Sequence, residues 1–280
     1  MPGGGIDRDV ARCGQFRSWA ATHAGTADRL NEDAYVNRPD LGLWAVADGA
    51  GGHEAGEVAS AEVARLLQTI DAGLSGSEML MAVRSRLEDA HAHLHAQAAR
   101  LGGGAMIATT VVAVLARDDH FACLWAGDSR AYLLRGQVLT RITRDHTLVQ
   151  ALLDSGAITE AEAIDHPQAN VITRAVGDGT DMLELDKRTG QLMTGDRLLL
   201  CSDGLSKSLP EERLAELLAG DQETGVERLI AAALAAQAID NVTVVMIDFG
   251  PCDEAATVEA ESADVAAPPV PEAKSTVEAA

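Results

Sequence analysis

The sequence predicts an α+β fold in which antiparallel β-sheets are covered by helices. Strand-like apolar runs follow one another as hairpins, and helix-like segments come in pairs, without a regular alternation of one strand with one helix. The chain has 280 residues, of which 47% are hydrophobic, so it can build a sizeable core. Length alone leaves open whether that core is one large domain or two small ones.

The N-terminal half begins with strands and continues with helices. Residues 16–23 and 41–47 are predicted to form a strand pair. Within the stretch 57–67 the apolar side chains fall on one face of a helix, since they stand at positions 58, 59, 63, 66 and 67. The Asp71-Ala72-Gly73 step predicts the end of this helix, and a second helix is expected from about 77 to 101.

Strands dominate the middle of the chain, and helices return toward its end. The step Arg135-Gly136-Gln137 predicts a tight hairpin. The predicted strands after the second helix cover residues 110–115, 121–126, 131–135, 138–142, 198–202 and 242–249. The predicted helices in this part cover residues 147–155, 159–164, 210–219 and 224–237.

The two ends of the chain differ in composition from the rest. Residues 1–12 are expected to be flexible, and residues 13–250 to form the folded domain. From Pro251 onward the chain is rich in Pro, Ala and Glu without sustained periodicity, so residues 251–280 are predicted to be a disordered acidic tail. An inert tail is favoured over a docking tail.

Composition also narrows the classes of partner. The formal net charge of −21 argues against a nucleic-acid partner, because phosphate neutralisation needs a basic patch. The N-terminus has no apolar segment typical of a signal peptide, and no run reaches membrane-spanning length. The cysteines form no CxxC pair. These features predict a reduced, cytoplasmic protein with no membrane partner.

Two aspartates in near-identical settings are the most informative feature of the chain. Asp48-Gly49 follows the apolar run 43–47, and Asp203-Gly204 follows the run 198–202. Each predicted strand thus ends at a carboxylate, and the glycine after it permits a sharp turn or close approach to a ligand.

Further acidic residues stand next to other apolar runs, in Asn31-Glu32-Asp33 and Asp240-Asn241. Carboxylates at strand ends, without a matching cluster of His or Cys, suit hard cations such as Mg²⁺ or Mn²⁺. A pair of such cations lowers the pKa of a bound water and neutralises phosphoryl oxygens. The pattern therefore favours a two-metal hydrolase.

Six strings in one order resemble the metal-dependent PP2C (PPM) protein phosphatases, over residues 18 to 249. They are Asn31-Glu32-Asp33-Ala34, the stretch 46–57 around Asp48, Ala126-Gly127-Asp128-Ser129-Arg130, Thr143-Arg144-Asp145-His146-Thr147, Cys201-Ser202-Asp203-Gly204-Leu205 and Asp240-Asn241-Val242-Thr243. Residues 145–177 are most similar to the bacterial members, and further resemble those encoded with type VI secretion systems.

This resemblance implies a central antiparallel β-sandwich flanked by helices on both faces, with a dimetal centre at one end. Asp48 would bridge two Mn²⁺ or Mg²⁺ ions and the Gly49 carbonyl would ligate one of them. Asp203 and Asp240 would ligate the other, so that Asp48, Asp203 and Asp240 are the catalytic aspartates.

The resemblance also implies outer members of the site and shows where the chain departs from the family. Glu32 and Asp33 would lie around the ions, directly or through water, and Asp128 would help to hold a third, weaker ion. The usual phosphate-gripping arginine is replaced by Asp28. Arg29 is the candidate phosphate ligand, and the alternative is that Arg29 is a surface residue and the phosphate site is weakened.

The residue after Gly49 and four histidines are assigned no role in the site. Ala50 stands where some members have a histidine proposed as general acid, and His53 should not inherit that role, so the proton donor stays unassigned. His91, His93 and His95 alternate along a predicted helix, where a solvated face is favoured over a metal site.

The resemblance implies a protein serine/threonine phosphatase of bacterial type. Its substrates would be phosphorylated proteins, it would oppose a cognate Ser/Thr kinase, and type VI secretion regulatory components are candidate partners. Two alternatives stay open: a phosphatase-like binding module that has lost catalysis, and a hydrolase of a small phosphorylated metabolite.

Overall fold

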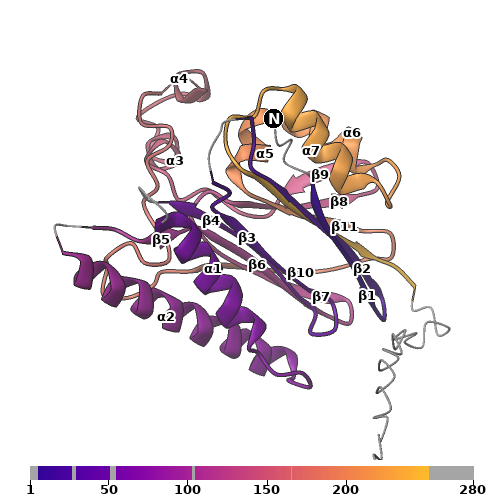
Figure 1. The fold of residues 1–280 in the computed structure, drawn as a ribbon. Helices are drawn as coiled ribbons and strands as arrows, with labels where there is room; N and C mark the ends of the chain where they lie inside the picture. The colour runs from indigo at the N-terminus through magenta and orange to yellow at the C-terminus, as the bar shows by residue number, and fades with distance from the viewer. Residues whose placement is uncertain (1–5, 27–29, 51–54, 103–104, 165, 252–280) are drawn as a thin grey trace, which may run out of the picture.

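The computed structural model describes residues 6–26, 30–50, 55–102, 105–164 and 166–251. The strands of these residues form two antiparallel sheets that pack face to face, and helices cover both outer faces (Figure 1). The predicted α+β class, with a central β-sandwich between helices, is confirmed.

The first sheet has β12 near its centre, and every residue of that strand is buried. Its β8–β9 hairpin turns at Gly136, where φ is 62°, and pairs Arg135 with Val138, as predicted from the sequence. In spatial order the strands are β1 (Asp7–Cys13), β2 (Phe16–His23), β12 (Val242–Phe249), β11 (Arg197–Cys201), β8 (Arg130–Arg135) and β9 (Val138–Arg141).

The second sheet contains β4 (Leu43–Ala50), which pairs with β3 (Asp33–Arg38) rather than with β2. The predicted pairing of residues 16–23 with 41–47 is therefore wrong, because these strands lie in different sheets. The spatial order is β10 (Asp186–Gln191), β7 (His120–Ala126), β6 (Val111–Arg117), β4 and β3, and β5 (Ala108–Thr109) pairs with the end of β4.

Three apolar layers hold the sandwich together, one between the sheets and one beneath each helical layer. The layer between the sheets includes the ring of Phe16, whose centroid lies 5.2 Å from that of Trp44. The two sheets are thus fixed face to face by large side chains, which stabilise the fold because they remove apolar area from water.

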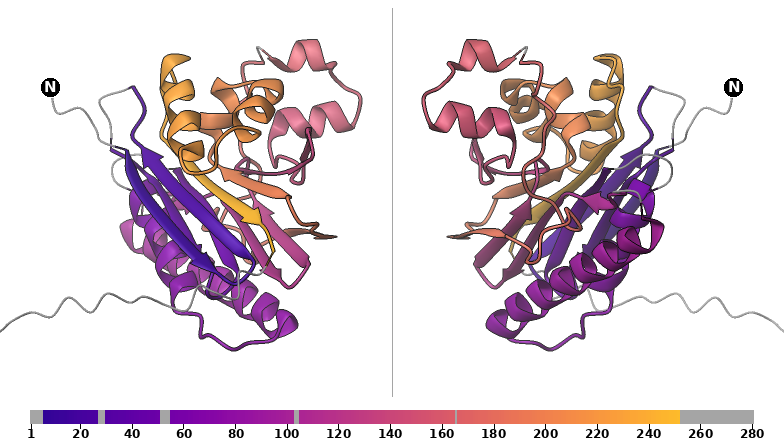
Figure 2. Two further views of the ribbon diagram at one scale, coloured as in Figure 1. Left: turned by 90° about the vertical axis from the view of Figure 1, so that its right-hand side faces the viewer. Right: turned by 90° about the vertical axis from the view of Figure 1, so that its left-hand side faces the viewer.

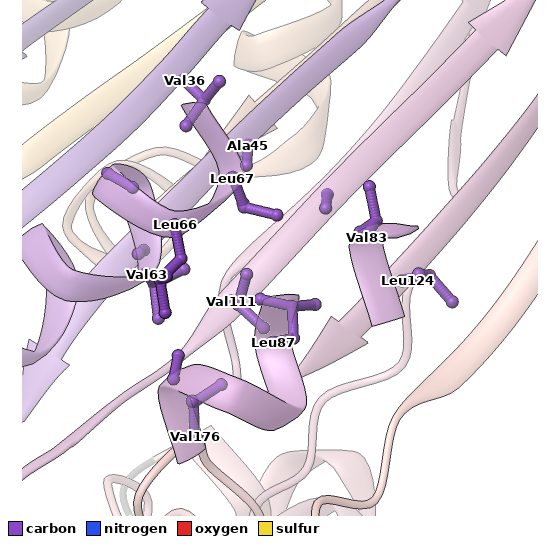
Figure 3. Close-up of a cluster of buried hydrophobic side chains, with 14 of the residues drawn as sticks. Val36, Ala45, Val63, Leu66, Leu67, Val83, Leu87, Val111, Leu124 and Val176 are labelled. Atoms are coloured by element: carbon purple, nitrogen blue, oxygen red, sulfur yellow. The ribbon is translucent and has the colours of Figure 1, made fainter. Parts of the chain in front are cut away.

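Helices α1 (Ala55–Gln68) and α2 (Gly76–Leu101) pack on the second sheet (Figure 3). Helix α2 begins at a capping box in which Ser75 and Glu78 satisfy each other's backbone N–H groups. On the other outer face, the first sheet is covered by α5 (Asp203–Ser208), α6 (Glu211–Leu218) and α7 (Gly225–Ala235).

The histidines of α2 differ from the predicted solvated face. His91 is 4% exposed, and its Nε2 lies 2.9 Å from the carbonyl of Thr180. The N–H of Gly177 donates to His91 Nδ1 at 3.0 Å. His93 and His95 are exposed, so the prediction is wrong for His91 alone, which joins α2 to the 177–180 loop.

Residues 145–186 contain two short helices, α3 (Leu148–Asp154) and α4 (Glu160–Ile164), at the same end of the molecule as α5 (Figure 2). Helix α4 has no buried residue, and Ile164 is 77% exposed. Sparse packing of this kind gives a segment low local stability. We call residues 145–186 the flap segment.

The N-terminal segment includes a strand that was not predicted from the sequence. Asp7–Cys13 form β1, which pairs with β2 along its whole length, and the flexibility expected for residues 1–12 stays a prediction. The backbone of these residues is fixed because β2 supplies hydrogen bonds to it. The predicted tail lies outside the described residues from residue 252 onward. Within the described part of the chain, no helix has both the length and the apolarity that crossing a membrane requires.

Candidate metal centre

The predicted acidic residues meet at one end of the sandwich because both sheets present strand ends there. Asp33 is the first residue of β3, and Asp48 lies near the end of β4. The two residues are direct partners in this antiparallel strand pair. Asp203 follows β11, and Asp240 precedes β12, which is the antiparallel neighbour of β11. Asp128 lies in the link between β7 and β8, which joins the two sheets.

A hydrogen bond connects the two groups of carboxylates across the sandwich. Ser202, directly before Asp203, donates its hydroxyl to Asp33 Oδ2 at 2.8 Å. The same hydroxyl accepts from the N–H of Thr243 at 3.0 Å, which fixes its orientation. Residues 33 and 203, far apart in sequence and on different sheets, are therefore neighbours.

Burial and neighbouring charges raise the pKa values of Asp33, Asp48 and Asp128. Burial is the main cause of the raised pKa of Asp48, and the charges of Asp33, Asp203, Asp128 and Asp240 add to it. Burial also raises the pKa of Asp33 to about 7 and that of Asp128 to about 6, with Asp203 adding to both. Clustered carboxylates of this kind favour protonation or a cation.

Several oxygens of the cluster are buried and accept no hydrogen bond. They are Asp33 Oδ1, both carboxylate oxygens of Asp128, and Asp203 Oδ1. A buried acceptor without a donor is costly unless a ligand satisfies it. Acceptor-only oxygens with repelling charges are the donor set that Mg²⁺ and Mn²⁺ prefer, so the residues fit such ions.

The carboxylates do not form a closed cage. Among the residues that the structure describes, no group of three or more His, Cys, Asp or Glu side chains is arranged so that it could hold a metal ion. Mg²⁺ keeps several waters in protein sites, so one or two carboxylates per ion suffice. The arrangement therefore fits ions whose shells are completed by water and a backbone carbonyl.

Gly49 provides close backbone contact at this point. A Cβ on Gly49 would lie 2.2 Å from the carbonyl oxygen of Gly56 and 2.7 Å from that of Glu32. A Cβ on Gly56 would lie 2.8 Å from Cδ of Glu32. The start of α1, the end of β4 and Glu32 thus approach so closely that neither glycine can carry a side chain, which explains the glycine after Asp48.

The backbone of Asp48 is fixed by two threonines of the neighbouring strands. Thr109 Oγ1 donates to the carbonyl of Asp48 at 2.9 Å, and the N–H of Asp48 donates to Thr110 Oγ1 at 3.2 Å. Thr110 Oγ1 also lies 2.7 Å from Ser129 Oγ, next to Asp128. The two threonines therefore fix the backbone of Asp48, whose carboxylate interacts with four others of the cluster.

Asn241 fixes the loop that carries Glu32. Its Oδ1 accepts from the N–H of Glu32 at 2.8 Å, and its Nδ2 donates to the carbonyls of Ala24 and Leu30. One buried amide thereby joins the start of β12 to the start of β3. This role explains why an asparagine follows Asp240.

Sequence reasoning missed one charged residue of the site, Lys207. It lies one turn after Asp203 on α5, and its ammonium contacts Asp203 Oδ2 and lies 3.4 Å from Asp128 Oδ2. The spacing of four residues would have shown it, had the helix after Asp203 been predicted. That helix is only six residues long and was not expected.

The flap segment is attached close to Asp128. His146 Nδ1 accepts from the N–H of Gly127 at 3.2 Å, and its ring stacks on that of Trp125. Burial lowers the pKa of His146, so the neutral ring that accepts this hydrogen bond is favoured. The flap segment therefore begins beside the acidic cluster.

A family model described as protein phosphatase 2C matches residues 22–237 of the chain. The chain belongs to the protein phosphatase 2C family. The predicted resemblance to the bacterial members is likewise confirmed.

Relatives of this protein phosphatase 2C member come from bacteria. The serine/threonine protein phosphatase PstP of Mycobacterium tuberculosis is 39% identical over 234 residues, which are 83% of this chain and 45% of PstP. The chain thus spans about half the length of that relative. A solved structure of PppA from Pseudomonas aeruginosa is 37% identical in sequence and has a TM-score of 0.77, over 86% of this chain and 99% of PppA. PppA is described as a key regulatory component of the type VI secretion system of that organism.

A second solved structure carries metal. The catalytic domain of PstP in complex with two manganese ions is 36% identical, with a TM-score of 0.73 over 83% of this chain and 97% of that one. Three residues discussed in the sequence analysis, Asp28, Arg29 and His53, lie outside the described residues.

Proposed function

We propose that the chain is a metal-dependent protein serine/threonine phosphatase that hydrolyses phosphoserine and phosphothreonine. The observation that carries this proposal is the buried cluster of Asp33, Asp48, Asp128 and Asp203, with oxygens that have no protein donor. Membership of the protein phosphatase 2C family supports the same reaction. Turnover of a phosphothreonine peptide with and without divalent metal tests it.

The acidic cluster is the proposed site of two Mn²⁺ or Mg²⁺ ions. Asp48, central among the carboxylates that repel it, would bridge the ions, and Asp203 and Asp240 would hold one of them. The backbone carbonyl of Gly49 would serve the other ion. Two such ions would lower the pKa of a water molecule and neutralise phosphoryl oxygens, so that no covalent phospho-enzyme is required.

The protein groups around these ligands have positioning roles in this proposal. Thr109 and Thr110 hold the backbone of Asp48, while Ser202 keeps Asp33 Oδ2 turned toward Asp203. Glu32, whose backbone is held by Asn241, would contact the ions directly or through water. Because these groups are held in position before the substrate binds, they would not need to reorganise when charge develops in the transition state.

Phosphorylated proteins are the proposed substrates, and a cognate Ser/Thr kinase in the cytoplasm is the proposed counterpart. The named activity of PstP supports the substrate class. We also propose a regulatory role in type VI secretion, which the likeness to PppA supports.

A phosphatase-like binding module is the second candidate function. The observation that favours it is the replacement of the usual phosphate-gripping arginine by Asp28, together with Ala50 after Gly49. Such a module would bind phosphopeptides with metal but release no phosphate. A malachite-green assay of released phosphate in Mn²⁺, run beside a peptide-binding measurement, distinguishes the two functions.

Shortening the flap segment should alter substrate selectivity more than chemistry. Helix α4 packs no side chain into the core, so replacing residues 157–168 by a short Gly-Ser linker should leave the domain folded. We expect kcat/KM for a phosphopeptide to change by roughly tenfold, about 1.4 kcal/mol, while p-nitrophenyl phosphate hydrolysis changes little. Equal changes for both substrates would show that the flap segment is ordinary scaffold.

Arg29 is the proposed ligand of the substrate phosphate. Arg29→Ala should raise KM for a phosphopeptide with a smaller fall in kcat, because a charge-assisted contact made equally to substrate and transition state is lost. The competing hypothesis predicts that Arg29→Ala has no effect and that Asp28→Arg lowers KM. Steady-state kinetics of both variants on one peptide decide between them.

A further inference from the structure

Lys207 places a positive charge between two carboxylates of the acidic cluster. Its Nζ contacts Oδ2 of Asp203, one turn earlier on α5, and lies 3.4 Å from Oδ2 of Asp128, in the β7–β8 link. It also donates to Oδ1 of Asn170, in the flap segment, at 2.9 Å. The ammonium thus joins three parts of the chain at one point.

The two carboxylates are far less accessible than the lysine that joins them. The side chains of Asp128 and Asp203 are 4% and 13% exposed, whereas that of Lys207 is 41% exposed. The stem of Lys207 therefore reaches from the surface into the cluster. Its Nζ is placed between the two carboxylates by the α5 backbone, one turn after Asp203.

We propose that the Lys207 ammonium is a built-in cation between Asp128 and Asp203 that excludes a third divalent ion from this space. The inference rests on the proposed function, since it concerns the same acidic cluster. A divalent ion bound by both carboxylates would need their oxygens at about 2.0–2.2 Å, which requires the ammonium to leave. Repulsion between the two cations opposes simultaneous occupancy.

The contacts of Lys207 also argue against a role as a phosphate ligand. An ammonium has three N–H donors. Asp203 Oδ2 and Asn170 Oδ1 accept hydrogen bonds from it, and Asp128 Oδ2 is its ion-pair partner at 3.4 Å. A substrate phosphate could therefore bind Lys207 only at the expense of one of these contacts. In this proposal Lys207 takes the place of a third divalent ion, and the substrate phosphate is bound by other residues.

Counting bound Mn²⁺ tests the inference directly. The charge is removed by Lys207→Met, and free Mn²⁺ is followed by electron paramagnetic resonance during a titration of the full chain. We expect the wild type to bind two ions and Lys207→Met to bind one more, weaker ion. Lys187→Met is the matched control, because it removes the same charge from an exposed position on β10, and it should bind two.

Two further variants make the result specific. Lys207→Gln retains a donor to Asp203 and Asn170 but has no charge, so it should also gain the third ion, even if the methionine variant folds poorly. Adding Asp128→Asn to either variant should return the count to two. Thermal unfolding in EDTA should show a lower Tm for Lys207→Gln than for Lys187→Met, and excess Mn²⁺ should reduce this difference.

The outcomes separate this inference from the proposed function. If the wild type binds no Mn²⁺ and releases phosphate in EDTA, the metal-dependent function fails. If the wild type and Lys187→Met bind two ions and both Lys207 variants also bind two, the function stands and the role of Lys207 is overturned. A third ion on the wild type would equally contradict it, as would a raised KM with an unchanged ion count.

Discussion

Replacing Asp48, Asp203 or Asp240 by Asn is expected to lower kcat for a phosphothreonine peptide by at least two to three orders of magnitude, roughly 3–4 kcal/mol of transition-state stabilisation. An amide keeps the size of the carboxylate but loses the charge that binds the ions. Asp48→Asn should have the largest effect, because Asp48 interacts with four other carboxylates of the cluster.

The same three substitutions should not unfold the domain. Burial and neighbouring carboxylates raise the pKa of Asp48, so its charged form is unfavourable when metal is absent. Asp48→Asn removes this repulsion and should raise the Tm in EDTA. The control is Asp71→Asn, at an exposed position beyond α1, which should change neither kcat nor Tm. Near-normal turnover by Asp48→Asn would show that the bridging role belongs to another residue.

EDTA is expected to abolish turnover of a phosphothreonine peptide, and added Mn²⁺ or Mg²⁺ to restore it. The ions would be exchangeable because no closed cage of side chains surrounds them in the described part of the chain, and water completes their shells. Asp33 Oδ1, Asp128 Oδ1 and Asp203 Oδ1 accept no hydrogen bond, so removal of the ions would leave these buried oxygens unsatisfied.

Metal should also stabilise the fold, because ions that bind only the native state shift the unfolding equilibrium. A titration with Mn²⁺ should raise the Tm in parallel with the return of activity. Zinc or calcium serves as the comparison, since neither shares the octahedral preference of Mg²⁺. Undiminished turnover in chelator would refute the proposed two-metal chemistry.

The sequence alone determined most of the strands and helices and the acidic ends of two strands. The apolar runs before Asp48 and Asp203 predicted β4 and β11, and the period of the apolar residues predicted α1. These features are local, because a strand or helix is specified by the pattern of its own residues. The edge strand β1 was missed because its mostly exposed residues lack an apolar pattern.

Strand pairing and side-chain environments were decided only by the tertiary structure. Strands β2 and β4, separated in sequence only by β3, lie in different sheets, whereas β2 pairs with β12, more than 200 residues later. His91 is buried because the 177–180 loop folds over α2, which no helical periodicity can show. Lys207 meets Asp128 only because the β7–β8 link and α5 converge at one end of the sandwich. The local pattern thus specified which residues carry the charges, and long-range packing decided which of those charges meet, since contacts between distant segments depend on the whole fold.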